Sequence, residues 1–116
     1  MGFLSTHVLD TANGRPAAGL LIELFRADDS RLLLGSATTN KDCRCDEPML
    51  EGASFVSGEY ELVFHAGDYF AAGGRDLPQP RFLDRVVIRF GVSDASQHYH
   101  VPLLISPFAY STYRGS

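Results

Sequence analysis

The alternation of apolar and polar residues along the chain predicts a protein built from short β-strands. Residues 58–64 carry large apolar side chains at every second position, Tyr60, Leu62 and Phe64, with mostly glutamate between them, and residues 85–92 repeat this pattern. Successive side chains of a strand point to opposite faces, so each segment is expected to bury one face and expose the other.

Further strands are expected where β-branched, aromatic or apolar residues run between turn-forming residues. These segments are residues 3–9, 20–25, 31–39, 98–105 and 110–114. A short polar turn separates 20–25 from 31–39, so these two should pair antiparallel. The one candidate helix is 65–72, and with barely two turns it must depend on packing. Residues 10–16, 40–48 and 50–57 are expected to be turns and loops.

Seven or eight short strands joined by hairpin-like turns favour an all-β fold. A sandwich of two antiparallel sheets with one short helix is expected, and a barrel is the alternative. The length of 116 residues suits a single domain spanning 1–116, because such a chain can bury one core but not two. No repeat, low-complexity segment or interior linker divides it.

The charge of the chain narrows the classes of partner. The formal net charge is −4 and lysine and arginine form no cluster, which argues against a nucleic-acid or anionic-membrane partner. No apolar run reaches the length of a transmembrane helix, and neither a secretory leader nor a C-terminal peroxisomal tripeptide is present. A cytoplasmic protein acting on small molecules or proteins is therefore expected.

Two cysteines, Cys43 and Cys45, are separated by one residue. A disulfide across a single residue would be strained in an extended segment, and two thiols without a CxxC spacing or a paired histidine do not make a zinc site. Free, reduced cysteines are expected, as is usual in the cytosol.

Histidines supply the candidate chemistry. His98 and His100 fall on one face of an otherwise core-like strand, and His7 lies inside an apolar strand. A buried imidazole needs partners on both nitrogens or a function that uses them. From residue type alone His7 is a hydrogen-bonded structural residue, and His65, at a strand-to-helix junction, is a cap or packing residue. Arg44, flanked by aspartates, has the pattern of a solvated turn residue.

The last nineteen residues, HYHVPLLISPFAYSTYRGS, resemble the C-terminal signature of the 5-hydroxyisourate hydrolases, the transthyretin-like enzymes of urate breakdown. Four further blocks are similar to that family, in order and at similar spacing: LSTHVLDTANGRPA, TNKDCRCD, GEYELVFHAGDYFAA and FLDRVVIRF. The resemblance covers essentially the whole chain.

This resemblance implies a transthyretin-like (prealbumin) sandwich. It also implies hydrolysis of 5-hydroxyisourate to 2-oxo-4-hydroxy-4-carboxy-5-ureidoimidazoline, with no metal and no other cofactor. The assembly that it implies is a homotetramer built as a dimer of dimers.

The resemblance also assigns residues. His7, Arg44, His100 and Ser116 match the catalytic positions, and Arg44, Tyr113 and Ser116 match the substrate-binding ones. Two histidines would activate water and deliver a proton, in an order that the sequence leaves open, while Arg44 would hold the substrate and its developing oxyanion. His98 would be a supporting or rim residue. Cys43 stands where the family carries glycine, so the local turn geometry needs a structure.

Four alternatives remain. Transthyretin itself is a non-enzymatic carrier on the same fold, but it lacks the histidine at position 100 and the Tyr-Arg-Gly-Ser ending. A purely structural sandwich would leave the paired histidines unexplained. Zinc on His7, His98 and His100 is disfavoured, because no carboxylate stands at ligand spacing and Arg44 would oppose a cation. A serine nucleophile is also disfavoured, since no Gly-x-Ser-x-Gly elbow occurs.

Overall fold

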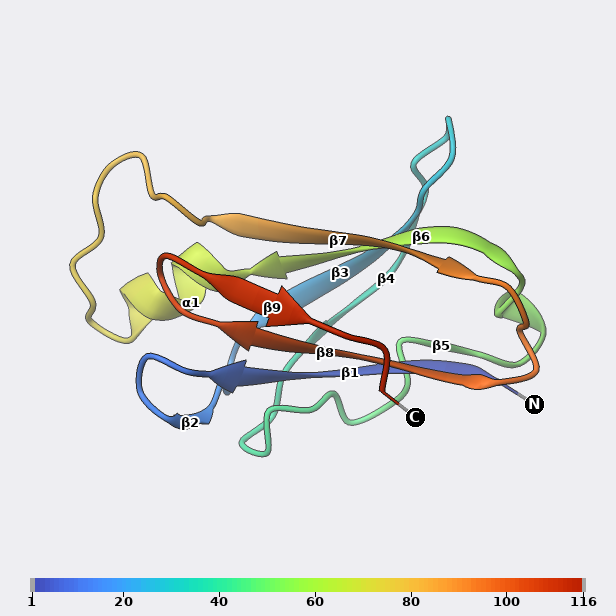
Figure 1. Ribbon diagram of the computed structural model, residues 1–116, viewed down its shortest axis with the longest axis horizontal. Coiled ribbons are helices and arrows are strands. Elements are labelled where there is room, and N and C mark those ends of the chain that lie inside the picture. The colour runs from blue at the N-terminus through green and yellow to red at the C-terminus, as the bar shows by residue number, and fades with distance from the viewer. Residues whose placement is uncertain (1, 116) are drawn as a thin grey trace.

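Two β-sheets lie face to face in the computed structural model, which describes residues 2–115 (Figure 1). The strands are β1 (Phe3–Asp10), β2 (Arg15–Pro16), β3 (Leu21–Arg26), β4 (Leu33–Thr38), β5 (Leu50–Glu51), β6 (Gly58–His65), β7 (Arg85–Val92), β8 (His98–Ile105) and β9 (Tyr110–Thr112). A 3-10 helix, η1 (Gly52–Ser54), and one α-helix, α1 (Ala66–Ala72), complete the regular structure of these residues. The expected sandwich with one short helix is confirmed.

One sheet has the order β2-β1-β8-β9, with β5 also paired to β1, and the other has the order β4-β3-β6-β7. Every pair of strands is antiparallel except β1 and β8, which run parallel over eight residues. The prediction of two purely antiparallel sheets therefore fails at this one pair. A parallel pair needs a long crossover, and here the whole second sheet lies between the two strands in sequence.

Most strands follow the predicted pattern. The hairpin of β3 and β4 is antiparallel as expected, and β6 and β7 keep their predicted alternation. Two strands of two residues each, β2 and β5, lie in segments predicted to be turn and loop. Both pair with β1, and such short pairings leave no periodicity in the sequence.

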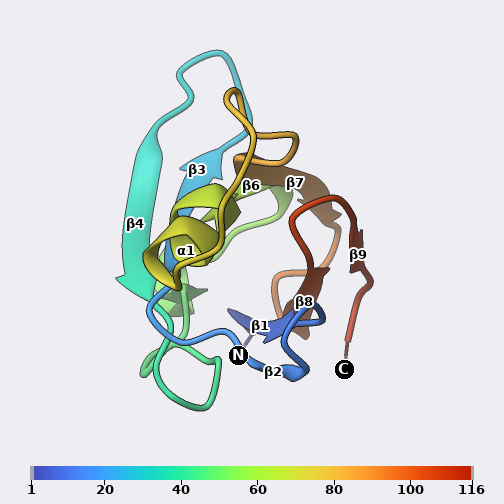
Figure 2. The same cartoon turned by 90° about the vertical axis from the view of Figure 1, so that its left-hand side faces the viewer.

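The core fills the space between the two sheets, which Figure 2 shows nearly end-on. Leu4 and Val8 of β1 face Tyr60, Leu62 and Phe64 of β6, and all five side chains are fully buried. This burial supplies most of the driving force for folding, since a buried side chain of this size contributes about 2 kcal/mol. Residues of β1 that point away from the core are left free to form a surface.

Helix α1 covers one end of the sandwich (Figures 1 and 2). Its residues Ala66, Gly67 and Phe70 are buried. Within residues 2–115, no helix has the length and apolar character needed to cross a bilayer.

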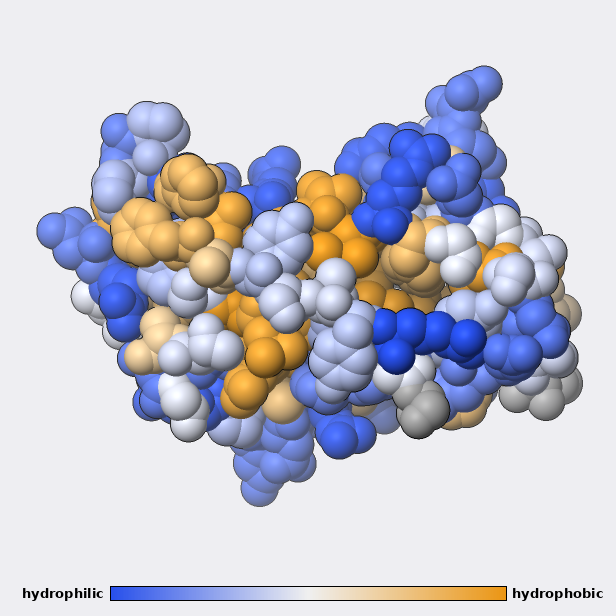
Figure 3. Space-filling view, in the orientation of Figure 1, coloured by the Kyte–Doolittle hydropathy of each residue, from blue (hydrophilic) through white to orange (hydrophobic). Residues whose placement is uncertain are grey.

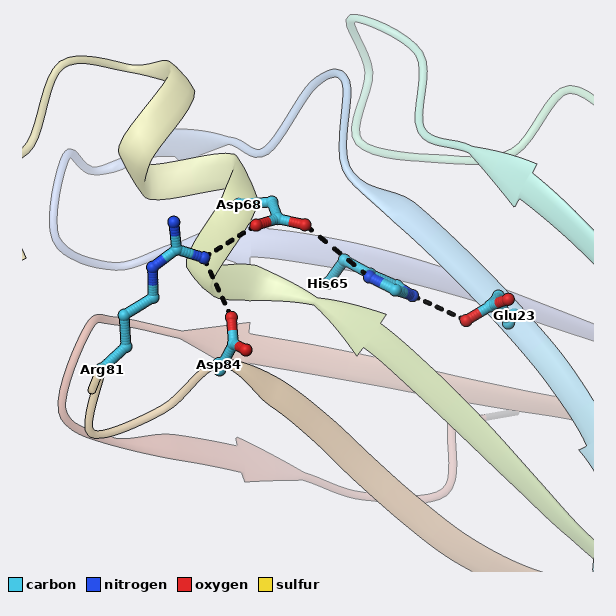
Figure 4. Close-up of polar contacts among 5 residues, drawn as sticks. All are labelled: Glu23, His65, Asp68, Arg81 and Asp84. Carbon is cyan, nitrogen blue, oxygen red and sulfur yellow. Dashed lines mark hydrogen bonds and ion pairs between the residues drawn. The ribbon is translucent and has the colours of Figure 1, made fainter. Parts of the chain in front are cut away.

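Beside α1 lies a polar cluster, drawn in Figure 4, in which His65 Nε2 is 2.6 Å from Glu23 Oε1 and Arg81 Nη1 donates to Asp68 at 2.7 Å and to Asp84 at 2.9 Å. His65 occupies the N-cap position of α1, but its imidazole makes no capping hydrogen bond and engages Glu23 instead. Asp68 and Asp84 are largely exposed, so water screens the two ion pairs of Arg81 and they contribute little to stability.

A buried carboxylate, Asp10, anchors the end of β1. It accepts hydrogen bonds from the backbone N–H of Asn13 at 2.9 Å, the Asn13 side chain at 2.7 Å and the Tyr69 hydroxyl at 2.8 Å. Burial raises the pKa of Asp10, but the hydrogen bonds from Asn13 and Tyr69 together outweigh it and hold the pKa below its ordinary value. The strand that carries His7 is thereby tied to α1.

The buried hydroxyl of Thr39, just after β4, tests how much the hydrogen bonds between strands and loops stabilise the sandwich. This hydroxyl donates to the Ala17 carbonyl at 2.6 Å and accepts from the Leu20 N–H at 3.0 Å. Thr39→Val keeps the shape but leaves both backbone groups unpaired, so the free energy of unfolding should fall by about 2 kcal/mol in urea denaturation. Thr39→Ser keeps the hydroxyl and is the control. A Thr39→Val protein as stable as wild type would contradict these contacts.

Candidate active site

The parallel pairing of β1 and β8 brings three imidazoles onto one outer face of the sandwich. Phe3, Ser5 and His7 of β1 lie opposite His98, His100 and Pro102 of β8, respectively. The residues that alternate with them point into the core: Leu4 and Thr6 on β1, and Tyr99 and Val101 on β8. The prediction that His98 and His100 share a face is confirmed. His7, half-buried, lies diagonally across from His100 on the same face.

Hydrogen bonds join these side chains. Nδ1 of His7 is 2.7 Å from Nε2 of His100, and Nδ1 of His100 is 2.7 Å from Oγ of Ser5. The same Ser5 oxygen is 2.7 Å from Nε2 of His98. Sequence analysis missed Ser5. Its position two residues before His7 places it on the same face, but only the register of β1 against β8 shows that it meets both histidines.

Arg44 is held beside β1 by a loop that Asn40 organises. The side-chain oxygen of Asn40 accepts from the N–H of Asp42 at 2.8 Å and of Arg44 at 3.2 Å, and its amide donates to Asp46 at 2.9 Å. The backbone N–H of Asn40 also donates to the Arg44 carbonyl at 2.7 Å. Arg44 forms an isolated β-bridge with His7, and its side chain is exposed. Asn40 was also missed, because its polar neighbours gave no periodic signal.

Cys43 adopts the left-handed backbone conformation, with φ of 60°. Glycine takes this conformation freely, whereas a side chain costs roughly 1 kcal/mol there. The turn geometry left open by the sequence is thus one that favours glycine. Cys43 and Cys45 are both free, as expected. Burial, reinforced by Asp46, raises the pKa of the Cys45 thiol.

The C-terminal segment is docked against β8. The N–H of Gly115 donates to the His100 carbonyl at 2.7 Å, and a Cβ at Gly115 would lie 3.0 Å from Cδ2 of the imidazole. The Arg114 guanidinium donates to Gln97 at 2.8 Å and lies 4.0 Å from the ring centroid of Tyr99. Ser116 lies outside the described residues, so its assignment stays a prediction.

These elements enclose an open depression of about 600 Å³. Among its lining residues are His7, Arg44, His100 and Tyr113, every predicted site residue that lies within 2–115. A larger depression of about 840 Å³ beside α1 holds one imidazole, His65, which Glu23 already engages. Because paired imidazoles and a guanidinium meet in the smaller depression, it is the candidate active site.

The electrostatics of the depression favour neutral imidazoles. Burial lowers the pKa of His7, and the positive charge of Arg44 lowers it further. Burial also lowers the pKa of His100, with smaller contributions from His7, His98 and Arg44. Imidazoles with lowered pKa values are unprotonated at neutral pH and can accept a proton. Within residues 2–115 no group of three or more His, Cys, Asp or Glu side chains is arranged to hold a metal ion.

Comparison with known proteins identifies the family of this chain. Residues 4–115 match the model of the HIUase/Transthyretin family. The chain is 61% identical over 116 residues to 5-hydroxyisourate hydrolase 2 of Rhizobium meliloti (strain 1021), covering 99% of this chain and 97% of that protein.

Two solved structures share the fold. The 5-hydroxyisourate hydrolase of Klebsiella pneumoniae superposes with a TM-score of 0.83 at 35% identity, covering the whole of both chains. A crystal structure of (S)-allantoin synthase gives a TM-score of 0.94 at 46% identity over 99% of this chain, and this chain spans 44% of that one. Fold and sequence identity over the full length agree, and the chain belongs to the HIUase/transthyretin family.

Proposed function

We propose that this protein hydrolyses 5-hydroxyisourate in urate degradation, using the depression between β1, β8 and the Arg44 loop. The contact between His7 and His100, 2.7 Å between ring nitrogens, is the observation that carries the proposal. Neutral imidazoles can accept a proton from water, and Arg44 lines the same depression. The proposed enzyme is a single domain spanning residues 1–116, and its proposed location is the cytoplasm, which cell fractionation tests.

The reaction opens a cyclic amide. Water attacks a ring carbonyl while an imidazole of the His7–His100 pair takes its proton, and the carbonyl oxygen becomes negatively charged. The guanidinium of Arg44 stabilises that charge and orients the oxygen-rich ring. The carbon–nitrogen bond then breaks, and the imidazole pair returns the proton to the leaving nitrogen. Tyr113, whose ring borders the depression, and Ser116 complete substrate binding in this proposal.

The decisive experiment follows the near-ultraviolet absorbance of fresh 5-hydroxyisourate with and without protein. Wild type should accelerate its loss far beyond the spontaneous decay, whereas a non-enzymatic carrier would not. His7→Asn and His100→Asn should each lower kcat by roughly a hundredfold or more, because each removes a proton-transferring group. Arg44→Lys should lower kcat and raise KM, because lysine keeps the charge but loses the planar fork.

His65→Asn is the matched control for these variants. It makes the same chemical change at an imidazole outside the depression, so its kcat should equal that of wild type. If the His100→Asn protein kept wild-type turnover, the catalytic assignment would be wrong.

A homotetramer, built as a dimer of dimers, is part of the same proposal. Strands β7 and β9 are the outer strands of their sheets, and all three residues of β9 are exposed. Exposed aromatic residues lie close by: the rings of Phe82 and Phe108 are 6.1 Å apart, and Tyr110 is 47% exposed. Figure 3 shows patches of apolar surface on this face, on either side of the paler surface over β9. Edge strands and exposed aromatic side chains are both protected by self-association.

Light scattering tests the assembly. Wild type should have the mass of four chains, and Phe108→Asp should lower it, because a carboxylate would have to be buried at the contact. Leu32→Asp is the control, since Leu32 is as exposed as Phe108, 57% against 60%, but lies at the turn between β3 and β4. A fully active wild-type monomer would exclude the tetramer.

A further inference from the structure

Four side chains in the depression form one continuous hydrogen-bonded chain: His98, Ser5, His100 and His7. Each of its three contacts is 2.7 Å long, and each crosses between β1 and β8. Both ring nitrogens of His100 are engaged, Nδ1 by Ser5 and Nε2 by His7. His100 therefore has no free nitrogen with which to take a proton directly from water, and Nε2 of His7 is the nitrogen at the end of the chain.

Two arrangements place the Ser5 hydroxyl proton within the chain when all three rings are neutral, since each ring and the hydroxyl carry one proton. In the first, His98 donates to Ser5, Ser5 to His100 and His100 to His7, so that Nε2 of His7 carries a proton. In the second, every bond is reversed, and Nε2 of His7 has a free lone pair. In both arrangements the Ser5 hydroxyl couples the rings, because it donates to one imidazole as it accepts from the other.

We propose that Ser5 and His98 are positioning residues that set the protonation of the His100–His7 pair and extend it into a four-member proton relay. The inference rests on the proposed hydrolysis and orders its two histidines. His7 is the catalytic residue that exchanges protons with water and the leaving nitrogen, and His100 acts through it.

The relay accounts for every proton in the reaction. Beginning in the second arrangement, Nε2 of His7 takes a proton from the attacking water as the new carbon–oxygen bond forms. The Nδ1 proton of His7 passes to His100, the Nδ1 proton of His100 to Ser5, and the Ser5 proton to His98, which becomes the imidazolium. When the carbon–nitrogen bond breaks, Nε2 of His7 gives its proton to the nitrogen and the relay returns to its starting arrangement.

Packing holds His98 in the orientation that the relay needs. The Phe3 ring stacks on the His98 imidazole with centroids 3.9 Å apart and planes 18° apart. The Arg114 guanidinium donates to the backbone carbonyl of His98 at 3.3 Å. The relay also moves the positive charge to His98, which is three members away from His7 along the chain.

Ser5→Ala tests the relay in the hydrolase assay. It should lower kcat by about tenfold with KM unchanged, one order less than the loss of a direct acid or base. Ser5→Thr restores the hydroxyl on a strand that suits threonine, so it should recover most of kcat. His98→Asn should resemble Ser5→Ala in size. Thr11→Val is the matched control, because it removes a hydroxyl that donates to the Ile105 carbonyl of β8 outside the depression, and it should keep wild-type kcat.

A second readout separates a relay from simple packing. The measurement is kcat in mixtures of H₂O and D₂O. For wild type, a plot of kcat against the deuterium fraction should be curved, because several protons move together. For Ser5→Ala the same plot should be a straight line. Wild-type kcat in Ser5→Ala, or a straight line for wild type, would overturn the relay while leaving hydrolysis intact. A wild-type protein without hydrolase activity would instead overturn the proposed function.

Discussion

The site depends on one constraint, the parallel pairing of β1 with β8. Residues more than ninety positions apart become neighbours only through this register, and a shift of one residue would turn every imidazole from the outer face into the core. The buried residues of both strands prevent such a shift, because Leu4 and Leu103 would then have to face solvent. Core packing and catalytic geometry are therefore fixed by the same alternation.

That geometry places His7, His98, His100 and Arg44 in one depression, which Asp46 and Glu47 also line. Burial and Arg44 oppose protonation of His7, and burial, His7, His98 and Arg44 oppose protonation of His100. The burial and the charges that depress the imidazole pKa values thus keep bases available at neutral pH. The buried carboxylate of Asp10, three residues after His7, engages Asn13 and Tyr69 and does not line the depression.

Much of this arrangement could be predicted from the sequence, and the rest depends on contacts between distant segments. Alternation alone gave β6, β7 and the shared face of His98 and His100, and the family resemblance gave His7, Arg44 and Tyr113. Ser5 and Asn40 could not be found in this way, because an isolated serine or asparagine has no periodic signal and acquires its meaning from strand register or loop closure. The parallel direction of β1 and β8 was missed for the same reason, since strand alternation is identical in both directions.

The central claim is that the depression keeps His7 and His100 unprotonated at neutral pH. An NMR titration of the histidine rings, assigned with the His7→Asn and His100→Asn variants, measures this directly. Because burial and nearby positive charges both disfavour the imidazolium, both rings should have pKa values below the ordinary 6.5 and stay neutral until the pH falls past that value. Titration of both rings at or above 6.5 would contradict the account.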